Sequence, residues 1–511
     1  MQNVIQRGSI YMKNPMQAVQ GSALTKKSLL AEMLRVLKER EDKLKEESAA
    51  AIMEERAPES KKERVAGTKK TRAAKSKKKI VWEKEYDNLI LGNGPDGVYS
   101  MDPKISKAAN NNVLVIGGTG GGKTKSVVEA NILHTFHQSM AVLLTKRRLL
   151  DQYAPLLKSR GYDVKILNLV HPEQSDVGYD PLMHIKDDTD IIGLGKALVA
   201  SSGCTSAKEP YWENSAADLF TAFVRLAKAV YGDKARMANV LERIRKMDKP
   251  PLLDEEDCGD TDMRELQYLR PADQFLVLQE KEPQMYMSWS QYDNNSVGTR
   301  NCIRSMLFSA INSVLPKSVQ QIMAMPEQLE FTDLVNRKTV LFILTSPVNP
   351  ALHPFANLML GTMFKELFEY GESLPGGRVP IPLMAICDDF ATGGQIPNFQ
   401  QHISIFREKG IAVMTLVQSL SQLESMYGQA ASIIIQDNTD NIIYMGGNNL
   451  DTAEQMSRRI NRPMNEVLEL PRGQIYLFRN GQKALQLQRY QIFKDLLYQQ
   501  EIASMENANV R

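Results

Sequence analysis

The chain has 511 residues, of which 43% are hydrophobic and 24% charged. This composition supplies enough apolar material for a large buried core and excludes a disordered chain, and the length predicts two or more domains. The longest apolar stretches, among them 340–344 and 381–387, run for only a few residues, whereas a membrane-spanning helix needs about 20. We therefore expect a globular protein without a transmembrane helix.

The N-terminus and the cysteines both favour a cytoplasmic protein. The first 25 residues mix Gln, Asn, Arg and Lys and lack the continuous apolar core of a signal peptide. The cysteines lie far apart, without the spacing of a metal site, and so few in so long a chain do not make a disulfide framework. We expect all four to be reduced: Cys204, Cys258, Cys302 and Cys387.

The basic charge is concentrated in one short segment. The whole chain carries a formal charge of +3, but residues 61–79 hold ten Lys or Arg and one acid, a local charge of +9, so the rest of the chain sums to −6. Because residues 58–79 are nearly devoid of apolar side chains, they cannot bury enough surface to fold, and we interpret them as a linker. The segment either contacts nucleic acid or anionic lipid through its charge, or is only a solvated tether.

An amphipathic helix is predicted before this linker. Leu30, Leu37 and Leu44 recur at seven-residue spacing within residues 26–56, among Glu and Lys. Such a stripe either packs on a partner helix or, because three leucines make few heptads, belongs to a solvated helix with modest contacts. We assign residues 1–80 to an N-terminal extension that consists of this helix and the flexible basic linker.

From about residue 81, short apolar runs alternate with helical periods. This is the pattern of an α/β fold, a mainly parallel sheet wrapped by helices. The predicted strands are 113–116, 141–145, 164–169, 340–344, 383–387, 412–417 and 442–445.

Strand signals vanish between residues 180 and 335, where 218–231 and 238–247 have clear helical periodicity. An all-α domain is therefore expected as an insertion into the sheet domain. The expected division is 81–179 for the first part of the sheet domain, 180–335 for the all-α domain, 336–490 for the second part and 491–511 for a C-terminal tail.

A glycine-rich loop follows the first predicted strand. It has the sequence Gly117-Gly118-Thr119-Gly120-Gly121-Gly122-Lys123-Thr124 and matches G-x-x-x-x-G-K-[ST], the P-loop pattern. Glycines let backbone N–H groups surround phosphates, and the helix that follows adds a partial positive charge. We expect ATP to bind here, with Lys123 on the β and γ phosphates, Thr124 on Mg²⁺ and Lys125 as a further nucleotide contact. The alternative is a glycine-rich turn that binds nothing.

A magnesium ion at a P-loop needs a carboxylate ligand. Asp388 comes directly after the apolar run 381–387, and an aspartate at the end of a buried strand is the expected ligand. Its neighbour Asp389 would then polarise the attacking water. The alternative is that both are ordinary loop acids, but the presence of a P-loop favours the functional interpretation.

Several segments together resemble the coupling proteins of conjugative type IV secretion, which are relatives of hexameric DNA pumps. The resemblance covers about residues 88–485 and implies a RecA-like P-loop domain with an inserted all-α domain. Its landmarks are 111–116 before the P-loop, then 161–169, 178–182 and 209–217, and above all 388–399 (DDFATGGQIPNF), 407–411 (REKGI) and 418–423 (QSLSQL).

The resemblance implies catalytic roles for two more residues. Gln418 ends a strand that in such ATPases lies between the P-loop strand and the carboxylate strand, so its amide would sense the γ phosphate. Arg407 matches an arginine directed at the nucleotide of a neighbouring subunit, where a guanidinium offsets charge in the transition state. Without the resemblance, Arg407 would be a solvated helix residue and Gln418 a polar contact at a strand end.

The function implied by the resemblance is DNA transport. Such a protein is a cytoplasmic, ring-forming ATPase, a hexamer when assembled, that receives the single-stranded transfer DNA with its bound relaxase and delivers it to a type IV secretion channel. Two alternatives remain open. One is an adaptor that binds nucleotide but hydrolyses it weakly, and the other is a DNA packaging or repair helicase unrelated to secretion.

Three features depart from the family pattern. The chain lacks the usual N-terminal transmembrane helices, so a position at the inner face of the bacterial membrane would require a separate membrane protein as anchor. Asp389 stands where many members have Glu, one methylene longer. Residues 145–148, Thr-Lys-Arg-Arg, replace an acidic turn that contains proline, and their basic charge would suit a phosphate backbone.

Overall fold

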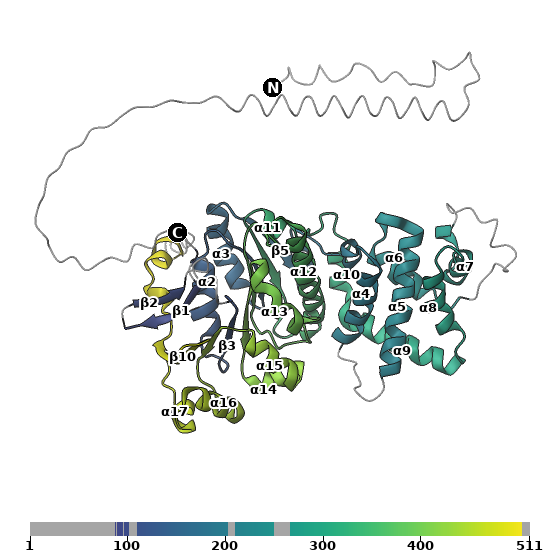
Figure 1. Ribbon diagram of the computed structural model, residues 1–511. Coiled ribbons are helices and arrows are strands. Elements are labelled where there is room, and N and C mark those ends of the chain that lie inside the picture. The colour runs from purple at the N-terminus through teal and green to yellow at the C-terminus, as the bar shows by residue number, and fades with distance from the viewer. Residues whose placement is uncertain are drawn as a thin grey trace, which may run out of the picture. The chain divides into compact units, whose positions relative to one another are not determined.

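The computed structural model describes residues 87, 89–95, 97–101, 110–202, 210–249 and 266–502. The predicted N-terminal helix, the basic linker and two of the four cysteines lie outside these ranges. All described residues belong to one compact unit. In this part of the chain the structure forms an eleven-stranded sheet with helices on both faces (Figure 1).

Seven parallel strands form the larger part of the sheet, from β9 in its middle to β5 at one edge, in the order β9-β3-β8-β7-β4-β6-β5. The apolar runs predict every one of them, with ends displaced by at most two residues, so the predicted α/β fold is confirmed. Their bounds are β3 Val113–Ile116, β4 Ser139–Leu144, β5 Asp163–Asn168, β6 Thr339–Leu344, β7 Leu383–Cys387, β8 Ile411–Val417 and β9 Asn441–Tyr444.

Four antiparallel strands extend the sheet beyond β9, in the order β10-β11-β1-β2. β2 and β11 are only partly buried and lack the continuous apolar runs of the parallel strands. β1 and β10 contain short apolar runs, 89–91 and 475–478, that the sequence analysis did not assign to strands. Their bounds are β1 Leu89–Gly94, β2 Gly97–Met101, β10 Gln474–Arg479 and β11 Leu485–Gln488.

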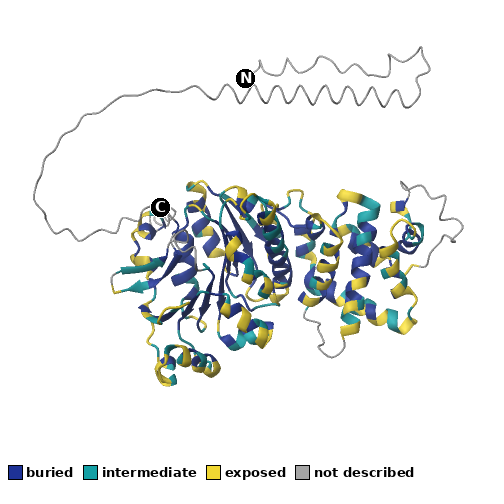
Figure 2. Ribbon diagram, viewed as in Figure 1, coloured by how far each residue is buried: buried dark blue, intermediate teal, exposed yellow. Residues whose placement is uncertain are grey.

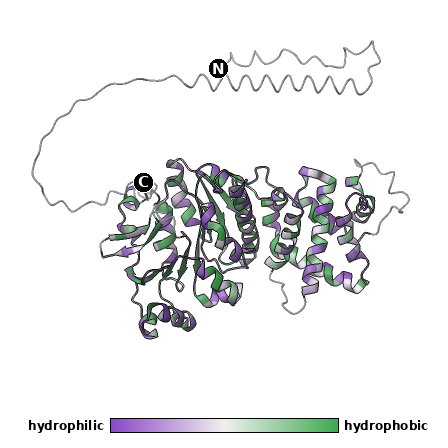
Figure 3. Ribbon diagram, viewed as in Figure 1, coloured by the Kyte–Doolittle hydropathy of each residue, from purple (hydrophilic) through white to green (hydrophobic). Residues whose placement is uncertain are grey.

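Alternation along each strand divides the core between the two faces of the sheet. In β3, Val113 and Val115 face one apolar cluster, whereas Leu114 and Ile116 face the other. The first cluster is covered by α2 and α3 and the second by α12 and α13, so the strands are buried on both sides (Figures 2 and 3). The bounds of these helices are α2 Glu129–Leu133, α3 Arg147–Ser159, α12 His353–Ser373 and α13 Phe399–Lys409.

Every element described between β5 and β6 is a helix. The buried side chains of this insertion, gathered around α5, are continuous with the apolar cluster on the α12 and α13 face of the sheet. Local signals fix several helix starts. Asp187 and Asp190 form a capping box at the start of α4, and the Ser296 hydroxyl accepts a hydrogen bond from the Thr299 N–H at the start of α9. The bounds are α4 Asp188–Ser201, α5 Pro210–Tyr231, α6 Met237–Arg245, α7 Pro271–Val277, α8 Pro283–Asp293, α9 Val297–Val314, α10 Lys317–Met323 and α11 Asp333–Asn336.

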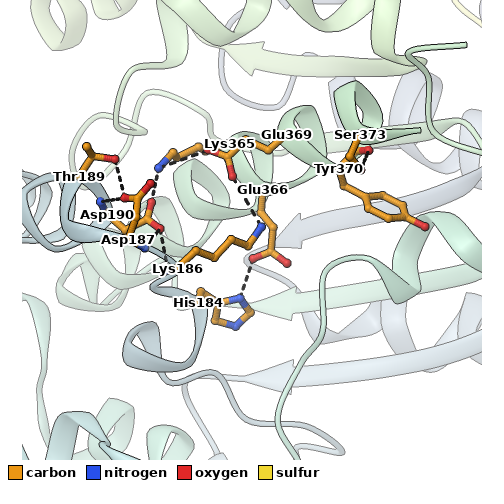
Figure 4. Close-up of polar contacts among 10 residues, drawn as sticks. All are labelled: His184, Lys186, Asp187, Thr189, Asp190, Lys365, Glu366, Glu369, Tyr370 and Ser373. Atoms are coloured by element: carbon orange, nitrogen blue, oxygen red, sulfur yellow. Dashed lines mark hydrogen bonds and ion pairs between the residues drawn. The ribbon is translucent and has the colours of Figure 1, made fainter. Parts of the chain in front are cut away.

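Polar contacts join the start of the insertion to α12 (Figure 4). The His184 Nδ1 atom lies 2.9 Å from Glu366 Oε2, and Lys365 pairs with Asp190. Because one partner of each pair belongs to the insertion and the other to a helix of the sheet domain, these contacts hold the junction between the two. The remaining helices are α14 Leu420–Tyr427, α15 Gln429–Asp437, α16 Leu450–Ile460 and α17 Met464–Leu468.

The described helices include none that is both long and apolar enough to span a bilayer.

Candidate nucleotide-binding site

The glycine-rich loop leaves β3 at the carboxyl edge of the sheet and is fixed there by two backbone hydrogen bonds. The Gly117 N–H donates to the Val417 carbonyl at 3.2 Å, and the Gly118 N–H donates to the Gly446 carbonyl at 3.1 Å. Gly122 has a φ of +83°, which a residue with a side chain rarely adopts. A Cβ atom on Gly121 would lie 2.8 Å from the Gly118 carbonyl oxygen. Glycine is therefore required here by the path of the backbone.

Lys123 lies folded against this loop. Its Nζ atom donates to the carbonyl oxygens of Gly117 at 2.5 Å and Gly118 at 3.4 Å. Burial lowers the pKa of Lys123, although the nearby carboxylates of Asp389 and Asp388 oppose this shift. A helical segment begins at the next residue, with a single π turn at Thr124–Val128 that continues into α2. The ammonium group thus lies at the start of a helix, beside the N–H groups that can bind phosphate.

Asp388 is brought to the P-loop by the sheet order. It follows β7, which is separated from β3 by one strand, and the Thr124 hydroxyl donates to Asp388 Oδ2 at 2.9 Å. Burial and the charge of Asp389 raise the pKa of Asp388, while the hydrogen bond from Thr124 and the charges of Lys123 and Lys146 partly offset the rise. A hydroxyl and a carboxylate in contact at a P-loop are the oxygen ligands that Mg²⁺ prefers.

Asp389 and Gln418 complete the polar wall of the same pocket. The backbone of Asp389 is left-handed, with φ 56°, and its Oδ2 atom lies 3.4 Å from the Thr145 hydroxyl. Gln418 follows β8, the strand between β3 and β7, as the resemblance implied. The hydroxyl of Thr119 lies 3.4 Å from Gln418 Oε1. The pocket holds about 430 Å³, and Thr119 to Lys125, Glu129, Lys146, Arg148, Leu149, Asp388, Asp389 and Gln418 line it.

Arg407 does not line this pocket. It is exposed near the C-terminal end of α13, whose last residue, Lys409, is followed by Gly410 and the start of β8. Gln418 lies at the other end of β8, so a strand of seven residues, roughly 20 Å long, separates the two positions. The structure therefore brings the other predicted catalytic residues together and leaves Arg407 away from the pocket of its own chain.

Four lining residues were not predicted as part of the site: Glu129, Lys146, Arg148 and Leu149. Glu129 is fully buried, and it accepts hydrogen bonds from Arg148 and from the Tyr153 hydroxyl. Lys146 is exposed at the pocket, where its charge lowers the pKa of Asp388. The unusual Thr-Lys-Arg-Arg sequence after β4 was the signal for two of them. Its basic residues give the pocket positive charge beyond that of Lys123.

One predicted contact has a partner outside the pocket. Lys125 lines the pocket, but its Nζ atom lies 4.1 Å above the ring of Phe493.

The segment expected as a C-terminal tail is, through Ile502, part of the sheet-domain core, with Leu497 and Tyr498 buried in the same cluster as β3.

Comparison with known families places this site in context. Residues 67–463 match the profile of a family described as type IV secretory system conjugative DNA transfer, and this is more than three quarters of the chain. The chain belongs to this family. The expected resemblance is thus confirmed, and with it the function of a coupling protein in conjugative DNA transfer, which disfavours the packaging or repair alternative. No curated protein sequence gives a significant match.

Solved structures of the coupling protein TrwB have the same fold. TrwB with ADP and Mg²⁺ is 16% identical to this chain, with a TM-score of 0.56, over 76% of this chain and 86% of that chain. The unbound TrwBdeltaN70 gives 16% identity, a TM-score of 0.55 and the same coverage. TrwB with the ATP analogue ADPNP gives 17% and 0.53, over 74% and 84%. At this identity the likeness establishes the fold, and the RecA-like P-loop fold is confirmed.

Proposed function

We propose that this family member is a DNA-stimulated ATPase whose hydrolysis cycle drives transfer DNA into a type IV secretion channel. The observation that carries the proposal is the contact between Thr124 and Asp388 inside a pocket lined by Lys123, Asp389 and Gln418. These are the groups that phosphoryl transfer requires, because its catalysis is mainly positioning and charge stabilisation.

The residues of the pocket fit ATP with Mg²⁺. Asp388 and Thr124 would hold the ion, which usually takes one or two protein oxygens and completes its shell with phosphate oxygens and water. The ion would neutralise charge on the β and γ phosphates. Among the described residues there is no group of three or more carboxylate, His or Cys ligands. A magnesium ion held by one hydroxyl, one carboxylate and the phosphates does not need such a group. TrwB itself was solved with ADPNP and with ADP and Mg²⁺.

The other side chains have distinct roles in this proposal. Lys123 exchanges the carbonyl oxygens of Gly117 and Gly118 for phosphate oxygens when ATP binds. Asp389 orients the attacking water and accepts its proton, and Gln418 contacts the γ phosphate from the neighbouring strand end. Arg407 acts on the nucleotide of the next subunit, and its position away from its own pocket supports a role in trans.

A ring of subunits, a hexamer when assembled, follows from this use of Arg407 and from the likeness to ring-forming DNA pumps. The proposed partners are the transfer strand with its relaxase, the components of the channel, and a separate membrane protein that holds the ring at the cytoplasmic face of the cell membrane. The helix predicted at 26–56 and the basic segment at 61–79 are the proposed contacts for that anchor or for DNA.

One observation favours a second candidate function, a nucleotide-binding adaptor with weak hydrolysis. Asp389 is one methylene shorter than the Glu expected at this position, and its left-handed backbone fixes where the carboxylate can reach. An ATPase assay of the purified full chain with no DNA, single-stranded DNA and double-stranded DNA separates the candidates. Turnover that rises with DNA supports the translocase, whereas ATP binding without turnover under all three conditions supports the adaptor.

A further inference from the structure

The two flanks of the P-loop strand carry different parts of the site. Asp388, Asp389 and Gln418 follow β7 and β8, on one flank of β3, and this is the flank of the γ phosphate in the proposed site. On the other flank lie β9 and the antiparallel strands β10 and β11. The base of a bound nucleotide is at the opposite end from its γ phosphate, so residues that reach the P-loop from β11 are candidates to meet it.

Arg489, the first residue after β11, reaches the P-loop. Its backbone N–H donates to the Gly473 carbonyl at 2.6 Å, and its carbonyl accepts from Asn93 Nδ2 at 3.3 Å. Its Nη1 atom donates to the Gly121 carbonyl, and a Cβ atom on Gly122 would lie 2.7 Å from that same nitrogen. The buried Nε atom has no hydrogen-bond partner among the described residues. Arg489 therefore holds the C-terminal segment directly against the phosphate-binding backbone.

Phe493 is presented to solvent beside this contact. Its side chain is 58% exposed although it belongs to a segment anchored by buried residues on both sides. His134 Nε2 lies 2.7 Å from Asp495 Oδ2, and Tyr490 also donates to that carboxylate. The rings of Phe493 and Tyr498 meet edge to face with centroids 5.4 Å apart. An exposed aromatic ring held in place in this way can serve as a surface on which a nucleobase stacks.

The face of the Phe493 ring is covered by the ammonium group of Lys125, which the phosphates of a nucleotide would attract. Lys125 Nζ lies 4.1 Å above the Phe493 centroid, and Lys125 follows directly after the P-loop threonine. A cation–π contact at an exposed site is worth only about 0.5–1 kcal/mol, so a phosphate oxygen can displace it. Movement of the ammonium to a phosphate leaves the ring open to the base.

We propose that Phe493 is the surface on which the nucleobase stacks, and that Lys125 exchanges the Phe493 ring for a nucleotide phosphate when ATP binds. This inference rests on the proposed nucleotide site and assigns its base-side wall to the C-terminal segment. Stacking on one aromatic face discriminates little between purines, because every base offers a π surface. ATP and GTP are therefore expected to bind with similar affinity.

The test measures ligand binding by calorimetry with Mg²⁺ present, using ATP and inorganic tripolyphosphate, which lacks a base. In the full chain, Phe493→Ala should weaken ATP binding by about 5- to 160-fold, the range for loss of one base–aromatic stack. It should not weaken the binding of tripolyphosphate, because Lys125 then has no ring contact to give up. Phe493→Tyr should bind ATP as the unchanged protein does. Leu496→Ala is the matched control, since Leu496 is an exposed apolar residue, 41% accessible, in the same segment.

Two results would overturn the assignment. Equal weakening of both ligands by Phe493→Ala would mean that the ring acts only by supporting the P-loop, and unchanged binding of ATP would mean that the base lies elsewhere. A protein without substitutions that binds neither ligand would overturn the nucleotide site itself, and this inference with it. Thermal unfolding of each variant confirms that the fold is kept.

Discussion

The Thr124 hydroxyl donates a hydrogen bond to Asp388 Oδ2 at 2.9 Å across 264 positions of sequence. The contact links the end of the P-loop to the end of β7, and in the proposed site the same two oxygens hold magnesium. The parallel order of β3, β8 and β7 makes it possible, because the carboxyl ends of these strands meet at one edge of the sheet.

Asp388→Asn is expected to abolish magnesium-dependent turnover. The amide keeps the size of the side chain but removes the charge that holds the ion, so a loss on the order of 100-fold or more is expected in the ATPase rate. Asp151→Asn is the control, because Asp151 is an exposed acid on α3 that does not line the pocket. A variant at position 388 with unchanged turnover would contradict the magnesium assignment.

Asp389→Asn is expected to lower turnover while ATP binding is kept. Asn tolerates the left-handed backbone at φ 56° as well as Asp does, so the variant removes the proton acceptor without straining the loop. Asp389→Glu tests the reach of the carboxylate. If the shorter side chain limits catalysis, turnover is preserved or rises, although Glu at this backbone conformation costs roughly 1 kcal/mol of stability. Loss of turnover in the Glu variant would point to a different base.

Stability is expected to fall as pH decreases below neutral, and His402 is one cause. Burial, helped by the positive charge of Lys365, lowers the pKa of His402 to about 4, while an unfolded chain binds the proton near pH 6.5. Because the unfolded state is protonated first, the stabilisation is complete above pH 6.5 and is lost as pH falls from 6.5 towards 4. Between pH 7.5 and pH 5 the loss from this residue is about 2 kcal/mol.

The measurement compares melting temperatures at these two pH values for the unchanged protein and for His402→Phe. Phenylalanine keeps the packing against the rings of Phe364 and Phe406 but cannot titrate. The variant should therefore lose less stability on acidification, while the other histidines contribute equally to both proteins. Identical pH dependence would show that His402 is accessible to protons in the folded state.

The sequence was most informative where one physical requirement dominates. Parallel strands buried on both faces need continuous apolar runs, such as Val113–Ile116, and these were predicted closely. The P-loop is similarly constrained, because only glycine fits at Gly121 and Gly122. The placement of Asp388 beside Thr124 then followed from the order of the strands.

Other parts of the site have no such local signal. β11 has the sequence LQLQ, which is typical of many exposed segments, and its place in the sheet depends on pairing with β10 and β1. Arg489 and Phe493 reach the P-loop only because that pairing brings the chain back to it. Glu129 looks like a solvated helix residue in the sequence, yet it is fully buried because Arg148 and Tyr153 satisfy its carboxylate.

Arg407 provides the most discriminating prediction, because it tests the ring and the mechanism together. Arg407→Ala should bind ATP normally but hydrolyse it poorly, as expected when charge stabilisation is lost only in the transition state. Arg458→Ala is the control, since Arg458 is an exposed arginine, 78% accessible, on α16. Reduced ATP affinity in Arg407→Ala would contradict a role confined to the transition state.

Mixing Arg407→Ala with Lys123→Ala then separates action in cis from action in trans. Lys123→Ala should be inactive alone, because the phosphates lose their main point charge. In a mixed ring, an intact P-loop from one subunit can meet an intact arginine from its neighbour, and with equal amounts about a quarter of the head-to-tail interfaces have this arrangement. An arginine that acts in cis cannot restore activity, since every subunit in the mixture carries a defect in its own site.

The experiment titrates one inactive variant into the other on DNA and measures the ATPase rate. Partial recovery supports the arrangement in trans, whereas no recovery in rings confirmed to contain both variants would remove Arg407 from the catalytic site.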